Sequence, residues 1–61
     1  MIISKKDKSI QYVGRGPVPH WLEGVERARF IELESRPCKL LVIEYEVYTV
    51  VDEDEECFLV E

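Results

Sequence analysis

Hydrophobic and polar positions alternate most clearly over residues 39–51, which read Lys-Leu-Leu-Val-Ile-Glu-Tyr-Glu-Val-Tyr-Thr-Val-Val. A period of two, built from β-branched and aromatic residues, is typical of a β-strand. This stretch of 13 residues is longer than the usual strand of about five to six. We therefore expect one long strand that bends, or that is shared between two halves of a small sheet or barrel.

The preceding stretch, residues 26–34, fits a strand better than a helix. Its apolar residues do not recur three and four positions apart, as one buried helix face requires. We expect it to pair with the strand that follows, through a hairpin loop at residues 35–38. Opposite charges then face each other at two consecutive positions, namely Arg29 with Glu44 and Arg27 with Glu46.

The carboxyl-terminal residues predict a second hairpin. The acidic run 52–56 interrupts the apolar pattern, which resumes at residues 57–60. Five neighbouring carboxylates repel one another and stay hydrated, so this run is expected to form the exposed hairpin loop. In this interpretation Val51 lies roughly opposite Cys57.

The amino-terminal part predicts one more strand and a short helical turn. Residues 9–13 alternate briefly and stop at the glycines and proline of residues 14–17. Residues 19–24 begin with Pro and end with Gly, as a single helical turn does. The expected fold is mainly β, with about four antiparallel strands in a curled or barrel-like sheet and one short helical turn, all in one small domain, residues 1–61. An α+β fold is the alternative.

Length and composition restrict the functional class. A chain of 61 residues has little room for a deep pocket with rigidly held catalytic groups, so we do not expect an enzyme. A hydrophobic fraction of 46% with only three Gly and three Pro argues against disorder. The longest aliphatic run, residues 40–43, is far short of the roughly 20 residues that span a bilayer. With no visible signal peptide and only two cysteines, we expect a cytoplasmic protein with free thiols and no membrane contact.

Charge is distributed unevenly along the chain. Residues 1–20 carry a net charge of +3, residues 21–61 carry −8, and no basic residue follows Lys39. Nucleic-acid binding depends mainly on Lys and Arg that neutralise phosphates, so direct nucleic-acid binding is not expected. A protein partner with a basic surface fits the acidic carboxyl-terminal part better.

The candidate chemistry of single residues is sparse. The acidic run lacks the Gly that a calcium-binding EF-hand loop needs at its sixth position, where Cys57 stands. Cys38, Cys57 and His20 are too few and too scattered for a zinc site, and no sequence motif supports a Cys-His nucleophilic pair. We therefore expect no metal, no cofactor and no catalytic residue.

Apolar residues on both faces of the predicted sheet favour an interaction role. One helical turn can cover only part of one face, so the other face must close into a barrel or meet another chain, and we expect a homodimer. Trp21 lies beside prolines and is a candidate docking anchor, although the only Trp of a small protein more often caps its core. The expected interaction residues are Trp21, Tyr48, Val50, Asp52, Glu53, Asp54, Glu55, Glu56, Phe58 and Val60.

Three functional classes follow from these observations. The preferred one is a non-catalytic protein-interaction module, such as a small subunit, adaptor or regulator, with an acidic recognition surface. The second is an acidic inhibitor of the mobile-element type that imitates nucleic acid, which requires carboxylates spread along a surface with phosphate-like spacing. The third, a small metal- or thiol-dependent enzyme, has the least support.

Overall fold

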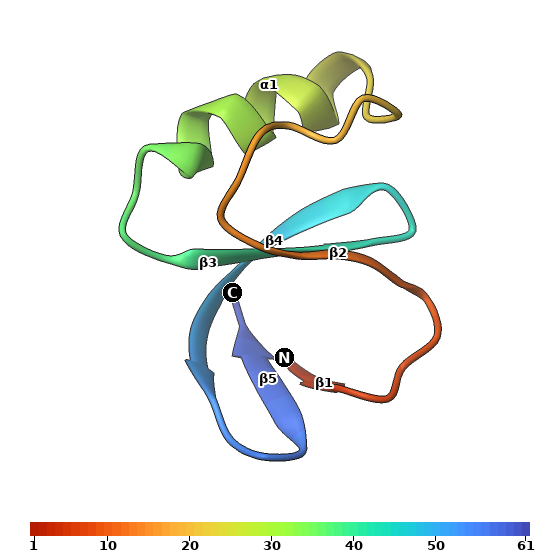
Figure 1. Cartoon of the computed structure of the whole chain (residues 1–61), viewed down its shortest axis with the longest axis vertical. Helices are drawn as coiled ribbons and strands as arrows, with labels where there is room; N and C mark the ends of the chain where they lie inside the picture. The colour runs from red at the N-terminus through yellow and green to blue at the C-terminus, as the bar shows by residue number, and fades with distance from the viewer.

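The computed structural model describes residues 1–61 as one antiparallel sheet with one helix against it (Figure 1). The sheet has five strands in the order β1-β5-β4-β3-β2, so β1 and β2 form its edges. The predicted mainly β fold with a curled antiparallel sheet is confirmed. The elements are β1 (Ile2–Ser4), β2 (Ile10–Gly14), α1 (Gly24–Glu34), β3 (Lys39–Ile43), β4 (Glu46–Glu53) and β5 (Cys57–Val60).

The sheet curls into a half-barrel, with α1 on one side of it and the β1–β5 pair at the opposite end of the molecule (Figure 1). The longest strand, β4, pairs with β3 along its first part and with β5 along its last part. A bulge between Val50 and Asp52 lies where β4 passes from one partner to the other. Because bulges bend a strand and increase its twist, this irregularity helps the sheet to curl.

The two faces of the sheet bury two separate apolar clusters. The helix-side core lies between α1 and the sheet and consists of Leu22, Phe30, Leu33, Leu40, Val42 and Val47. The sheet core is built from strand residues alone and consists of Leu41, Val50, Phe58 and Val60. Neighbouring residues of β3 point to opposite faces, so both faces of this central strand are buried.

Residues 26–34 are helical, and the predicted strand at this position is wrong. The helix α1 buries only Phe30 and Leu33, whereas Ile31 stays 55% exposed, so the apolar stripe is too narrow to recognise by spacing. Good helix formers such as Glu, Arg, Ala and Leu dominate the segment, and that propensity is the signal that identifies it. The predicted pairs of Arg29 with Glu44 and of Arg27 with Glu46 do not form, since both ion pairs of the chain involve Glu53.

The predicted long strand 39–51 is a tight hairpin of β3 and β4. Ile43 pairs with Glu46 across a two-residue loop, and both loop residues have positive φ, 50° at Glu44 and 67° at Tyr45. Such loops usually contain Asn or Gly, which are absent here, so no local signal marks the turn. The loop also reverses the phase of the alternation: Leu41 and Ile43 share a face with Tyr48 and Val50, so the face assignments of a single continuous strand do not hold beyond the turn.

The second hairpin is present, but its register differs from the predicted one. Glu53 pairs with Phe58 and Asp52 with Leu59, so the first part of the acidic run belongs to β4 and the loop is only residues 54–56. Val51 lies at the bulge instead of opposite Cys57.

The remaining differences concern the amino-terminal part. The predicted strand at residues 9–13 is observed as β2, one residue later, but β1 was not predicted and pairs with β5. The turn predicted at residues 19–24 is observed only over residues 19–22, where the Leu22 amide donates to the Pro19 carbonyl at 3.1 Å, and Gly24 begins α1 instead of ending the turn. At 11 residues α1 is too short to cross a bilayer, and no helix of the chain is long and apolar enough to do so.

Candidate functional site

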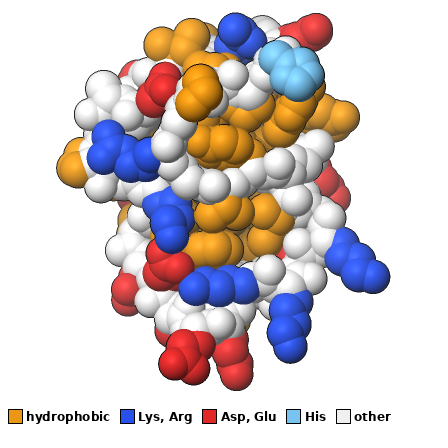
Figure 2. Space-filling view, in the orientation of Figure 1, with side chains coloured by type: hydrophobic (Ala, Val, Ile, Leu, Met, Phe, Trp, Pro, Cys, Tyr) orange, Lys and Arg blue, Asp and Glu red, His pale blue; other side chains and the backbone are white.

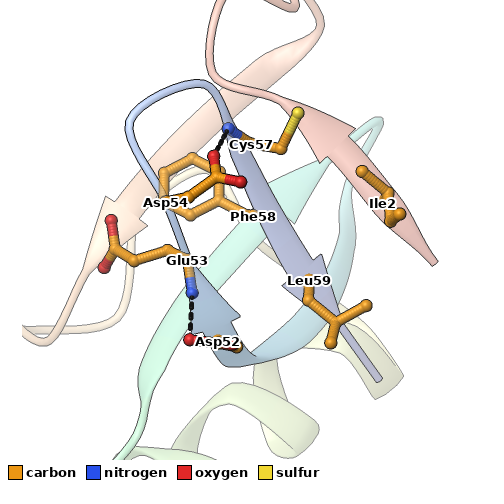
Figure 3. Close-up of a pocket in the computed structure, with 7 residues that line it drawn as sticks. All are labelled: Ile2, Asp52, Glu53, Asp54, Cys57, Phe58 and Leu59. Atoms are coloured by element: carbon orange, nitrogen blue, oxygen red, sulfur yellow. Dashed lines mark hydrogen bonds between the residues drawn. The ribbon is translucent and has the colours of Figure 1, made fainter.

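The acidic hairpin loop is organised by one of its own carboxylates. Asp54 Oδ1 accepts hydrogen bonds at 2.8 Å from the amide of Cys57 (Figure 3) and from that of Glu56, and the Asp54 amide donates to the Cys57 carbonyl at 3.0 Å. These two amide donors, Glu56 first, hold the pKa of Asp54 below its ordinary value. Asp54 therefore closes the turn between β4 and β5, as an Asx turn does.

Glu53 connects three segments that are distant in the sequence. Its carboxylate forms ion pairs with Lys39 at 2.5 Å and with Lys5 at 2.8 Å. The two ammonium groups also lie over the ring of Phe58, with Lys5 Nζ at 5.1 Å and Lys39 Nζ at 5.8 Å from its centroid. The hydrogen bond from Lys39, followed by that from Lys5, lowers the pKa of Glu53. The basic amino-terminal segment thus neutralises part of the acidic run within the chain.

A shallow groove lies on the outer side of these strands. It measures about 210 Å³ and is lined by Ile2, Asp52, Glu53, Asp54, Cys57, Phe58 and Leu59 (Figure 3). We call it the acidic groove. Ile2 pairs with Leu59 across β1 and β5, and these side chains are 70% and 41% exposed. The groove thus combines exposed apolar side chains from paired strands with carboxylates from the end of β4 and the loop.

Three of the residues expected to form a dimer contact are buried within one chain. Val50, Phe58 and Val60 are 8%, 6% and 3% exposed and make up most of the sheet core, while Tyr48 is half-buried against it. The curl of the sheet and the added strand β1 cover the face that was expected to stay open. A homodimer stays a prediction, but these residues no longer provide its contact surface.

Trp21 is both a core residue and a surface residue. It is half-buried and packs against the helix-side core. Its ring meets that of Tyr45 edge to face, with centroids 5.7 Å apart and an interplanar angle of 81°. Tyr45 is 59% exposed, and its amide donates to Gln11 Oε1 at 2.6 Å. The sequence analysis missed Tyr45, because it lies in a loop that was interpreted as strand.

Other reactive side chains lie apart from one another. Cys38 and Cys57 are half-buried and form no disulfide. No group of three or more His, Cys, Asp or Glu side chains is arranged to hold a metal ion. The Tyr48 hydroxyl donates to Glu46 Oε2 at 2.7 Å, and this hydrogen bond, with burial and neighbouring carboxylates, raises the pKa of Tyr48.

Much of the acidic run thus has a role within the fold. Glu53 and Asp54 are engaged by the chain itself, whereas Glu55 is exposed and outside both ion pairs. Comparison of the chain with protein-family models, with curated proteins and with solved structures finds no match.

Proposed function

We propose that this chain is a non-catalytic protein-interaction module that binds a partner through the acidic groove. The observation that carries the proposal is the pair of exposed apolar side chains, Ile2 and Leu59, held in register beside exposed carboxylates. Adjoining apolar and charged side chains of this kind are typical of interaction sites.

The chemistry of the groove indicates the kind of partner. Asp52 lines the groove and Glu55 lies in the adjoining loop; both are exposed and take no part in an ion pair, so they favour a partner with Lys or Arg at its surface. Ile2 and Leu59 would contact an apolar side chain of that partner. In such an interface the charges chiefly accelerate association, while the apolar contact slows dissociation.

Affinity capture from the native lysate tests this proposal. We would compare the wild type with Leu59→Ser, which removes an apolar contact from the groove, at low and high salt. Val25→Ser is the matched control, since Val25 is 80% exposed and lies on α1. Recovery of the same protein by the wild type and by Val25→Ser, but not by Leu59→Ser, is expected. Equal recovery by both variants would contradict the proposal.

The carboxylates are tested by binding kinetics with the captured partner. Replacing Asp52 and Glu55 with Ser should lower the association rate and flatten its dependence on salt, with less change in the dissociation rate. Glu53 and Asp54 are left unchanged in this experiment, because Glu53 binds both lysines and Asp54 closes the turn, whereas Asp52 accepts only one hydrogen bond, from the adjacent Glu53 amide. If the association and dissociation rates are unaltered at both salt concentrations, the carboxylates take no part in binding and the loop only connects β4 to β5.

The nucleic-acid-imitating inhibitor has less support. It requires free carboxylates spread along a surface, whereas three of the five in the acidic run, Asp52, Glu53 and Asp54, are engaged by the chain's own lysines and amides. A cytoplasmic location is proposed because the chain has only two cysteines and neither forms a disulfide.

A further inference from the structure

The loop between β3 and β4 presents an aromatic pair that lies outside the acidic groove. Tyr45 is 59% exposed, and its ring is held edge to face against Trp21. Trp21 packs against the helix-side core, which anchors the pair to the body of the domain. Rigid, partly exposed aromatic side chains are frequent contact residues in protein interfaces.

The backbone of this loop is poorly suited to the residues that occupy it. Glu44 and Tyr45 both have positive φ, 50° and 67°. Glycine adopts this conformation without steric cost, whereas a side chain with a Cβ atom does not. The stability of the loop alone therefore does not explain a Tyr at this position.

Two exposed carboxylates adjoin Tyr45 in the chain, and neither of them forms an ion pair. Glu44 and Glu46 flank Tyr45 and are exposed, and Glu26 reaches the same end of β4, where its Oε2 accepts from the Val47 amide at 3.1 Å. Glu46 also accepts a hydrogen bond from the Tyr48 hydroxyl at 2.7 Å, which is the main cause of the raised pKa of Tyr48, and the charges of Glu26 and Glu44 add to it. Both ion pairs of the chain involve Glu53, so no Lys or Arg balances these charges.

We propose that Trp21, Glu44, Tyr45 and Glu46, which we call the turn surface, bind a positively charged side chain of a basic segment in a protein partner. The faces of aromatic rings attract Lys and Arg side chains, and nearby carboxylates pair with the same cation. Charge complementarity therefore selects a basic peptide over an acidic or neutral one. This surface is separate from the acidic groove, and the proposal does not depend on that site.

The test uses a short peptide in which three arginines are separated by glycines, and the same peptide with neutral citrulline in place of each arginine. Binding to the full chain is followed by the NMR signals of Tyr45 and by the fluorescence of Trp21, the only Trp. The arginine peptide should shift these signals saturably, and the citrulline peptide should not. Equal shifts with both peptides would overturn the proposal.

Tyr45→Gly separates recognition from folding. It relieves the positive φ but also removes the edge-to-face contact with Trp21, and because these two effects are of similar size the urea midpoint should change little, while the Kd for the arginine peptide increases about two- to fivefold. Tyr45→Phe keeps the ring and should retain the affinity. An unchanged Kd in Tyr45→Gly would refute the proposal. If Tyr45→Gly fails to fold, the carboxylate variants decide the question.

Two variants of equal net charge complete the design. Glu44→Gln with Glu46→Gln should weaken peptide binding at low salt, and the difference should shrink at high salt. Glu32→Gln with Glu61→Gln removes the same charge at exposed positions that belong neither to the turn surface nor to the acidic groove, and it should change the Kd little. Equal weakening by both pairs would show only general attraction between an acidic protein and a basic peptide, and would overturn the proposal. The proposal would also be overturned if the molecular mass of the wild type in solution rose with protein concentration and that of Tyr45→Gly did not. A second copy of the chain would then occupy the turn surface.

Discussion

Truncating Phe58 tests whether the sheet core closes within a single chain. Phe58 is 6% exposed, packs among Leu41, Val50 and Val60, and lies beneath the ammonium groups of Lys5 and Lys39. Replacement of a buried Phe by Ala typically costs about 3–5 kcal/mol, because the lost apolar contact is joined by a residual cavity. We expect a loss of that size for Phe58→Ala.

The loss is large in relation to the whole domain. At about 0.05–0.15 kcal/mol per residue, a chain of 61 residues has a free energy of unfolding of about 3–9 kcal/mol. Phe58→Ala should therefore remove at least a third of the stability, or unfold the protein altogether. Leu59→Ala is the matched control, since Leu59 is 41% exposed and its truncation leaves no closed cavity, at a cost of about 1 kcal/mol.

Urea unfolding followed by Trp21 fluorescence measures both variants. Trp21 packs against the helix-side core, so a shift of its transition by Phe58→Ala also shows that the two cores unfold as one unit. The wild-type midpoint should not depend on protein concentration. Two results would refute the reasoning: a Phe58→Ala cost no greater than that of Leu59→Ala, or a midpoint that rises with concentration, as expected if a dimer covers the sheet core.

Three further predictions concern pH and backbone conformation. Because the pKa of Glu53 is lowered in the folded protein, its ionised carboxylate contributes full stability above the ordinary Glu pKa of about 4.3. This stability is lost as the pH falls through the pKa of the folded state. Glu53→Gln should therefore flatten the dependence of the urea midpoint on pH in this acidic range. The raised pKa of Tyr48 makes stability depend on pH in the opposite direction. The protonated hydroxyl stabilises the fold below about pH 10, and this stability is lost as the pH rises through the pKa of the folded state. Tyr48→Phe should remove this alkaline loss of stability in thermal unfolding monitored by circular dichroism. Gly24 has a φ of 62° with open space around it, so Gly24→Ala should cost about 1–2 kcal/mol through backbone strain alone, measured as a fall in the unfolding midpoint.

The strands that alternate strongly were predictable, and the elements that depend on distant contacts were not. The apolar pattern of residues 39–51 and 57–60 identifies strand residues and the hairpin that joins them. The helix α1 escaped recognition because only Phe30 and Leu33 face the core, which is too short a stripe for a periodicity argument. β1 has only three residues and is stabilised by pairing with β5 at the other end of the chain.

The candidate site was predictable only as a local charge pattern. The acidic run stands out in the sequence, and its last three residues, 54–56, form the loop between β4 and β5. Glu53 pairs with Lys5 because β1 lies beside β5, and no local sequence pattern reveals this pairing of distant strands. The exposed apolar pair of Ile2 and Leu59 depends on the same long-range pairing. The exposure of Tyr45 was not predictable, because Tyr45 lies in a turn that lacks the usual turn residues.

The burial of both faces of β3 affects how accurately the strand can be aligned with its neighbours. In most sheets a slip by one residue is prevented because it would move apolar side chains into water. In β3 such a slip would exchange Leu40 and Val42 with Leu41 and Ile43, and every side chain would remain apolar on either side. The alignment must therefore come from outside the strand, chiefly from the length of the Glu44–Tyr45 loop. Insertion of a single residue into that loop would make a shifted, still apolar pairing accessible, so that two packed arrangements of the same sheet would compete.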